Sequence, residues 1–263
     1  MYINVSIKNK TLIWRLSRQD RRNAIGPFLA NELSLLIKKL KTELKTYKNG
    51  HFLYNFLIIA ADIDKNDENP IWCGGGDLKE LNSLNRNEAD KYSKVMSKFC
   101  LDLQYLPIPV IAMVDGVVIG GGVELILSCD LVFCTQRSRF HFKQLQVGLP
   151  LGYGSSKIFI EKLGASLSMH LLLTSRQLDS LEALKLGIVQ EVHPGNTELL
   201  DRITLFEEQI KLICPQAFSM QKKTFSNYLS SSSSLQKSER SLFIKCWKSK
   251  WHKNFLEKFF KSI

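Results

Sequence analysis

The sequence predicts an α/β fold, with a strand-and-helix core over residues 1–195 and an all-helical part over residues 196–263. Three observations predict it. Short apolar segments of strand length alternate with amphipathic segments of helix length in the first part of the chain, which is typical of α/β proteins. Two of the apolar segments lead into glycine clusters that open a helix. After Pro215 only helical patterns remain.

The alternation can be followed along the whole chain. Strands are expected at Ile3–Ile7, Thr11–Arg15, Phe56–Ala60, Val110–Val114, Leu131–Cys134 and Val189–Val192. Helices are expected at Pro27–Tyr47, Glu88–Leu103, Val123–Cys129, Gly154–Leu163, Ser166–Leu173, Ser180–Leu186, Thr197–Ile213, Gln216–Tyr228, Leu235–Trp247 and Trp251–Phe260. Pro27 and Gly187 mark helix boundaries, because proline suits the first position of a helix and glycine the position after its end.

The two glycine clusters carry the clearest chemical signal. Gly74–Gly76 follows one buried strand and Gly120–Gly122 follows another, and each cluster leads into a helix. Glycine lets a ligand approach backbone N–H groups because no Cβ is in the way, and a helix N-terminus carries a partial positive charge. Two such junctions can each supply one donor to an oxyanion hole. Glu124, one turn inside the second helix, adds a carboxylate that suits proton transfer next to a carbonyl.

Four blocks, taken together and in order, resemble the crotonase superfamily, which is the enoyl-CoA hydratase/isomerase family. The blocks are Arg22–Ile25, Cys73–Glu80, Ile108–Asp130 with Gly120–Glu124 at its centre, and Leu178–Pro194. Each block alone is a weak signal, whereas the ordered set is specific because it extends over nearly the whole chain.

The resemblance implies a spiral of β-β-α turns, with helices in residues 196–263 that cover the site and contribute to homotrimers or hexamers. It implies an acyl thioester substrate, usually acyl-CoA, and no separate cofactor. The thioester oxygen would lie between the N–H groups of Gly76 and Gly121, and Glu124 would act as acid and base. The positions expected to hold the substrate or its coenzyme A are Ala24, Gly74, Leu78, Gly120 and Gly152.

One position departs from the family pattern. Hydratases of the family carry a second catalytic glutamate, and alignment on Gly148, Gly152 and Gly154 places Gln144 there. A glutamine can hydrogen-bond a water or a carbonyl, but it cannot transfer a proton. Gln144 is therefore expected to orient a water or the acyl group.

Three enzymatic hypotheses follow from this substitution. A hydratase would work with Glu124 alone while Gln144 positions the water, and an isomerase would need only Glu124. A decarboxylase of methylmalonyl or ethylmalonyl thioesters would use the oxyanion hole for its enolate, and the early proline at Pro150 resembles some decarboxylases of the family. Hydratase/isomerase chemistry ranks first because Glu124 and both glycine clusters are intact.

A non-catalytic relative that only binds acyl-CoA or RNA is the alternative outside the enzymes. Positive charge is concentrated in residues 220–263, interspersed with aromatic residues, and such a stretch can attract coenzyme A phosphates or nucleic acid. Its amphipathic pattern instead favours helices with aromatics in the core and lysines in water. Nucleic acid is therefore not expected as a partner, and a carboxylate buried at Glu124 without a task would only cost free energy.

Composition agrees with a globular enzyme. The chain has 263 residues, 44% of them hydrophobic and 23% charged, with a net charge of +11. No apolar run reaches the roughly 18 residues that span a bilayer, and the first residues lack a signal-peptide pattern. The six cysteines and five histidines show no spacing typical of disulfides or metal sites. A reducing, cytoplasmic compartment is expected, without metal or membrane partners.

Overall fold

The computed structural model describes residues 2–46, 52–64, 67–230, 240–241 and 243–261. Its strands form a six-stranded sheet in the order β1-β2-β3-β5-β7-β10 and a four-stranded sheet in the order β4-β6-β8-β9. The pairs β1–β2 and β8–β9 are antiparallel, and the other pairs are parallel. The strands are β1 (Ile3–Lys8), β2 (Thr11–Leu16), β3 (Phe56–Ala61), β4 (Ile71–Cys73), β5 (Val110–Val114), β6 (Val117–Ile119), β7 (Leu131–Thr135), β8 (Arg139–His141), β9 (Gln177–Asp179) and β10 (Glu191–His193).

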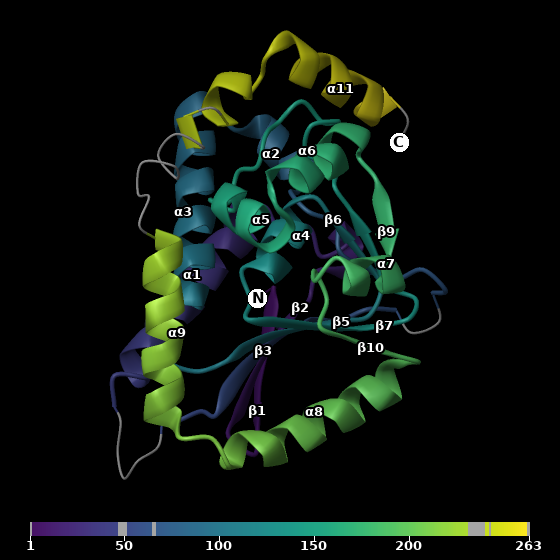
Figure 1. Ribbon diagram of the computed structural model, residues 1–263. Helices are drawn as coiled ribbons and strands as arrows, with labels where there is room; N and C mark the ends of the chain where they lie inside the picture. Colours follow the sequence, from purple (N-terminus) through teal and green to yellow (C-terminus); the bar gives the residue numbers. More distant parts are fainter. Residues whose placement is uncertain (1, 47–51, 65–66, 231–239, 242, 262–263) are drawn as a thin grey trace.

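Successive turns of the chain build a spiral. Strands β3, β5 and β7 enter the larger sheet, and each is followed by β4, β6 or β8 in the smaller sheet. Helices connect the turns, so the expected β-β-α spiral with helices after it is confirmed (Figure 1). They are α1 (Pro27–Glu43), α2 (Leu78–Ser83), α3 (Arg86–Gln104), α4 (Gly121–Leu127), α5 (Ser156–Leu163), α6 (Ala165–Thr174), α7 (Ser180–Lys185), α8 (Asn196–Lys211), α9 (Pro215–Ser230) and α11 (Lys250–Lys261), with a short 3₁₀ turn at Gln19–Arg21.

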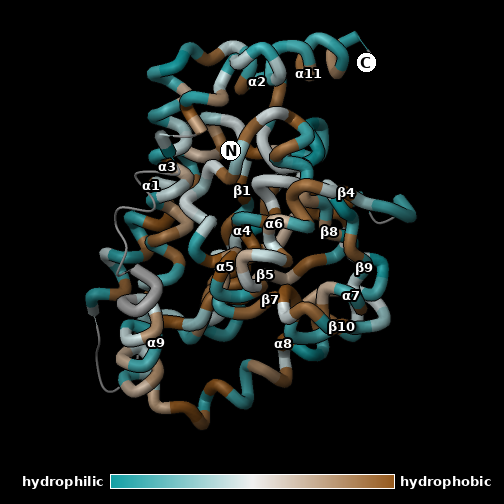
Figure 2. The backbone as a smooth tube through the Cα atoms, turned by 45° about the horizontal axis from the view of Figure 1, so that its top comes forward, coloured by the Kyte–Doolittle hydropathy of each residue, from teal (hydrophilic) through white to brown (hydrophobic). Residues whose placement is uncertain are grey.

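The core lies on both faces of the larger sheet. Every residue of β3 and β5 is buried, as expected for parallel strands covered on both sides. One face packs with the helices and the smaller sheet into the main apolar cluster. The other face packs against α8 through Leu199 and Ile203, and α8 lies below the sheet in Figure 1. The hydrophobic segments accordingly gather inside the molecule in Figure 2.

The smaller sheet was not expected from the sequence. Its four strands have three residues each, which is too short for a period-2 pattern to stand out. The predicted helix at 154–163 begins at Ser156 instead. Part of the predicted helix at 235–247 lies outside the described residues. Within the described chain, no helix has both the length and the apolar character needed to cross a membrane.

A buried lysine ties α9 to the core. The Nζ of Lys222 donates to the carbonyl oxygens of Leu103 and Ile108 at 3.1 and 3.0 Å and to the carboxylate of Asp130 at 2.6 Å. Asp130 also accepts from the backbone N–H of Val110 at 2.7 Å. Burial lowers the pKa of Lys222 and raises the pKa of Asp130, while their mutual attraction opposes both shifts. The pair therefore joins the first helix after α8 to the start of β5.

We expect Lys222→Ala to destabilise the fold by about 3–5 kcal/mol, because it leaves the Asp130 carboxylate buried without its partner. The measurement is urea unfolding followed by circular dichroism. Lys223→Ala is the matched control, since Lys223 is the exposed neighbour of Lys222 on the same helix. Equal unfolding midpoints for the two variants would contradict the anchoring role.

Candidate active site

The two glycine junctions lie side by side because their strands are neighbours. Strands β4 and β6 pair in parallel, so Gly74–Gly76 and Gly120–Gly122 leave the smaller sheet at the same edge. Their backbones touch at Gly75, whose φ is +83°. A Cβ on Gly75 would lie 2.7 Å from the carbonyl oxygen of Ile119 and 3.3 Å from the nitrogen of Gly121. Only glycine fits this conformation and this approach.

The first junction is fixed by the segment that precedes α1. The N–H of Ile25 donates to the carbonyl of Gly75 at 2.7 Å, and the N–H of Asp77 donates to the carbonyl of Ile25 at 3.1 Å. The Asp77 side chain caps α2, as expected from the sequence. The buried guanidinium of Arg18 lies 3.1 Å from the Asp77 carboxylate and 2.7 Å from that of Glu80. These contacts hold the loop that presents Gly76.

Two backbone donors remain available at the junctions. Within the described residues, no protein acceptor pairs with the N–H of Gly76 or that of Gly121. Both glycines line the same cavity. A negatively charged oxygen in this cavity could therefore bind to N–H groups that have no competing partner in the protein.

The cavity has a volume of about 660 Å³ and two different ends. Its inner end is buried, and its outer rim is exposed and mainly basic. The buried lining residues include Leu81, Tyr92, Glu124, Gln144, Leu149, Gly152, Tyr153 and Phe243. The charged rim residues are Asp20, Arg21, Arg22, Lys79 and Lys143. The cavity can thus take an apolar group inside and an anionic group at the rim.

Glu124 lies at the inner end with its carboxylate held by donors. Its Oε2 accepts from the N–H groups of Gly152 at 3.1 Å and Tyr153 at 2.9 Å, and from the hydroxyl of Ser155 at 2.6 Å. Its Oε1 accepts from the amide Nε2 of Gln144 at 3.4 Å. These donors fix the orientation of the carboxylate at the inner end of the cavity.

The side-chain oxygen of Gln144 is buried and is not paired within the protein. Only 6% of the residue is exposed, and its Oε1 has no hydrogen-bond partner in the protein. The carboxylate of Glu124 accepts only, so the amide of Gln144 must turn its nitrogen toward Glu124. A buried oxygen without a partner is costly, and the cavity is where a donor could reach it.

The cavity brings together all nine residues that the sequence analysis selected. They are Ala24, Gly74, Gly76, Leu78, Gly120, Gly121, Glu124, Gln144 and Gly152. Tyr92 and the rim residues Arg21, Arg22, Lys79 and Lys143 were not selected from the sequence, although Arg22 and Lys79 lie within two of the family blocks. Ser155 was not selected either, because its bond to Glu124 depends on a loop that returns from another turn of the spiral.

The C-terminal aromatics lie in the core only in part, as expected for some of them. Phe243 and Trp247 are buried in the main apolar cluster, whereas Phe255 and Phe259 line the cavity and Trp251 is 69% exposed. Helix α11 lies across the top of the molecule in Figure 1. In this helix the ring Nδ1 of His252 lies 2.7 Å from the carbonyl oxygen of Val147, and this contact joins α11 to the segment after Gln144. Most of the lysines of α11 face water, as the amphipathic pattern predicted.

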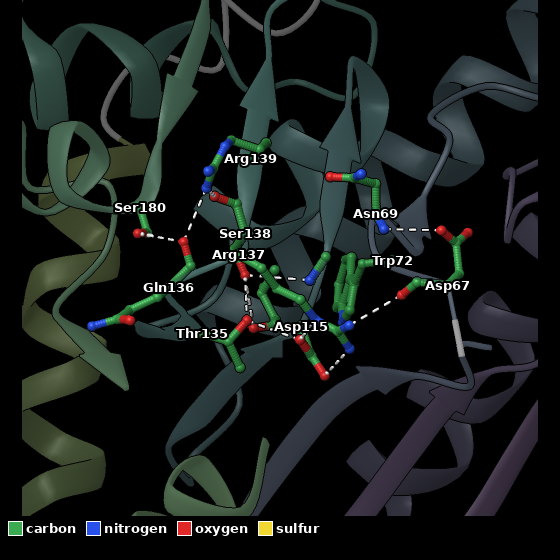
Figure 3. A network of polar contacts seen from close by, with 12 residues as sticks. Asp67, Asn69, Trp72, Asp115, Thr135, Gln136, Arg137, Ser138, Arg139 and Ser180 are labelled. Atoms are coloured by element: carbon green, nitrogen blue, oxygen red, sulfur yellow. Dashed lines mark hydrogen bonds and ion pairs between the residues drawn. The ribbon is translucent and has the colours of Figure 1, made fainter. Parts of the chain in front are cut away.

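A separate polar network contacts Asp67 in the acidic segment 62–70, of which residues 62–64 and 67–70 are described. Arg137 makes two hydrogen bonds to the Asp115 carboxylate, at 2.6 and 2.9 Å, and a third to the carbonyl of Asp67 at 3.1 Å (Figure 3). The hydroxyl of Thr135 also donates to Asp115 at 2.8 Å. None of the described residues of the segment lines the cavity. Across all described residues of the chain, no three or more His, Cys, Asp or Glu side chains form a group that could hold a metal ion.

Comparison with known proteins then identifies the family. The family model described as enoyl-CoA hydratase/isomerase matches residues 9–260. The chain belongs to this family. An enoyl-CoA isomerase/hydratase of Mycosarcoma maydis is 29% identical over 183 residues, which are 69% of this chain and 65% of that protein. The mitochondrial methylglutaconyl-CoA hydratase of Mus musculus is 27% identical over 70% of this chain and 54% of its own length. The matched segment thus spans between half and two thirds of these relatives.

Solved structures show the same fold over the whole chain. An enoyl-CoA hydratase from Bacillus halodurans superposes with a TM-score of 0.85 and 20% identity, covering 98% of this chain and 100% of the other. A methylmalonyl-CoA decarboxylase superposes with a TM-score of 0.80 and 20% identity, covering 100% of this chain and 96% of the other. The fold is therefore shared by proteins named for different reactions, so the reaction must be argued from the site.

Cys73, next to the first glycine junction, is expected to be unreactive. It is fully buried, and burial raises the pKa of its thiol to about 12, so little thiolate exists at pH 8. Alkylation of the native protein with iodoacetamide at pH 8, followed by peptide mass spectrometry, should label the exposed Cys214 and leave Cys73 unmodified. Labelling of both at similar rates would indicate a reactive thiol at the site.

Proposed function

We propose that the protein is an acyl-CoA thioester enzyme that adds water reversibly to the double bond of a 2-enoyl thioester. The observation that carries this proposal is the set of groups that share the cavity. The Glu124 carboxylate and Gln144 Oε1, which has no protein partner, line the same cavity as the two unpaired N–H groups of Gly76 and Gly121. Donors for a thioester oxygen and acceptors for a water are what this reaction requires.

The reaction can be written with Glu124 as the one proton carrier. The thioester oxygen accepts hydrogen bonds from Gly76 and Gly121, and Gln144 Oε1 holds the water. Glu124 removes a proton as the water oxygen attacks C3, and the electron pair of the double bond moves into an enolate that the two N–H groups stabilise. Glu124 then returns the proton to C2. One water is added in total, and the protein is regenerated.

The two acceptors at the inner end of the cavity, on Glu124 and Gln144, argue against decarboxylation as the main reaction. A malonyl-type thioester would bring its own carboxylate to the inner end of the cavity. That carboxylate would meet the carboxylate of Glu124 and the oxygen of Gln144, which are both acceptors. Like charges at short range disfavour such binding. Isomerisation needs only Glu124 and shares the same enolate, so it is the second candidate.

The basic rim supports coenzyme A as the thiol portion. Arg21, Arg22, Lys79 and Lys143 lie at the mouth of the cavity, where they would attract the phosphates of the coenzyme. The lysines of residues 220–263 are not needed for this role. The family resemblance also supports a homotrimer or a hexamer of this chain.

Mass spectrometry of the products tests the proposal directly. The purified protein is incubated with crotonyl-CoA, 3-hexenoyl-CoA and methylmalonyl-CoA. A gain of one water on crotonyl-CoA supports the proposal, and a shifted double bond in 3-hexenoyl-CoA would move isomerisation to first place. Loss of CO2 from methylmalonyl-CoA, without any hydration, would overturn it.

Glu124→Gln is expected to lower kcat for crotonyl-CoA by about 10²- to 10⁴-fold, because the base is lost. Affinity for butyryl-CoA, measured by calorimetry, should change only a few fold, because the donors to the thioester remain. Glu208→Gln is the matched control on the exposed face of α8 and should keep wild-type kinetics. Full activity of the Glu124 variant would refute the role of this carboxylate.

Gln144→Leu removes the acceptor for the water but keeps a side chain of similar size. The expected result is a fall in kcat of about 10²-fold, as for a misplaced reactant, with KM nearly unchanged. Gln144→Glu keeps an oxygen acceptor at this position and should retain more activity than the leucine variant. Steady-state kinetics of both variants with crotonyl-CoA make the comparison. Equal rates for wild type and Gln144→Leu would mean that the water is held elsewhere.

A further inference from the structure

Two tyrosines close the inner end of the cavity. Tyr92 comes from α3 and Tyr153 from the loop that binds Glu124, and they are only 5% and 4% exposed. Both line the cavity. Their rings meet edge to face, with centroids 6.0 Å apart and an angle of 76° between the planes. Together with Leu81 and Phe243, they form a wall of large buried side chains.

Tyr153 lies directly against the second oxyanion glycine. A Cβ on Gly121 would be 2.7 Å from Cε2 of Tyr153 and 2.8 Å from its hydroxyl oxygen. The edge of the ring thus occupies the space beside Gly121, next to the N–H that faces the substrate. The backbone N–H of the same tyrosine holds Glu124 at 2.9 Å. An acyl chain that continues past the reacting carbons would meet this ring.

The hydroxyl of Tyr153 is committed to a hydrogen-bond chain inside the protein. Tyr92 donates to the carbonyl of Ile25 at 2.8 Å, and the two tyrosine hydroxyls form a short hydrogen bond with each other. Tyr92 has only one proton, so Tyr153 must be the donor to Tyr92. Ile25 in turn accepts from Asp77 in the first glycine junction. The chain fixes the Tyr153 ring and leaves it no proton to donate to a substrate.

Ionisation does not free this ring at ordinary pH. Burial raises the pKa of Tyr92 and of Tyr153, and the nearby Glu124 carboxylate raises both further. The hydroxyls therefore remain protonated, and the hydrogen-bond chain persists. Tyr153 is thus a weak acid whose proton is already donated to Tyr92, so we assign its contribution to the bulk of its ring.

We propose that Tyr153, held in place by Tyr92, is the specificity-determining residue that limits the enzyme to short acyl chains. This inference rests on the proposed function, because it takes the buried end of the cavity as the acyl pocket. The ring stands beside the oxyanion hole and at the buried end, opposite the basic rim. Crotonyl-sized groups end before the ring, whereas medium-length chains require it to move, which breaks the hydrogen-bond chain to Ile25.

The test compares acyl groups of four and ten carbons in two independent assays. Calorimetry gives the affinities of butyryl-CoA and decanoyl-CoA, which cannot be hydrated, and kinetics gives kcat/KM for the 2-enoyl thioesters of the same lengths. Wild type should favour the four-carbon group by at least about tenfold in both assays. Tyr153→Ala should raise the ten-carbon to four-carbon ratio by at least about tenfold, because it opens the wall. Tyr153→Phe, which keeps the ring but loses its hydrogen bond to Tyr92, should give a ratio between those of the wild type and the alanine variant.

The outcomes separate this inference from the proposed reaction. A short-chain preference in calorimetry without turnover of any enoyl thioester would support the pocket and contradict the hydratase proposal. Wild type that binds decanoyl-CoA at least as tightly as butyryl-CoA would overturn the inference, even if it hydrates both. An unchanged ratio in a folded Tyr153→Ala variant would overturn it as well. The wild-type measurement keeps the test decisive if the alanine variant does not fold.

Discussion

The site depends on the close approach of two backbone segments that belong to different turns of the spiral. Gly75 lies so near Ile119 and Gly121 that a methyl group would overlap both. This approach is possible because β4 and β6 are adjacent parallel strands that end within one residue of each other in register and because glycine tolerates the positive φ. The positions of Gly76 and Gly121 follow from it. Both N–H groups therefore reach the same cavity without any side chain to position them.

A buried carboxylate must be compensated, and the loop 144–155 supplies the compensation. Gly152, Tyr153 and Ser155 donate to one oxygen of Glu124, and Gln144 donates to the other. Fixed donors cost no reorganisation during a reaction. The same loop carries the tyrosine ring that stands against Gly121. The orientation of the Glu124 carboxylate and the shape of the buried end of the cavity are thus set by one segment, which α11 contacts through His252.

The sequence predicted those parts of the fold whose signals are local or repeated. Buried strands such as Phe56–Ala60 and the glycine clusters before α2 and α4 are recognisable from residue types alone, and the ordered blocks identified the family. The smaller sheet could not be predicted, because three-residue strands carry no periodic pattern. The roles of Tyr92 and Ser155 could not be predicted either. Each depends on a contact across 31 or more residues of sequence, with Ile25 or with Glu124, which no local motif records.

The most direct test of the account is a crystal structure of the protein with butyryl-CoA, which the proposed reaction cannot consume. The account predicts the thioester oxygen about 2.7–3.1 Å from the nitrogens of both Gly76 and Gly121, with C2 and C3 facing Glu124 and Gln144. The phosphates should lie at the rim near Arg21, Arg22, Lys79 and Lys143. A thioester bound with its oxygen away from both glycines, or an acyl chain pointing out toward the rim, would contradict the assignment of the site.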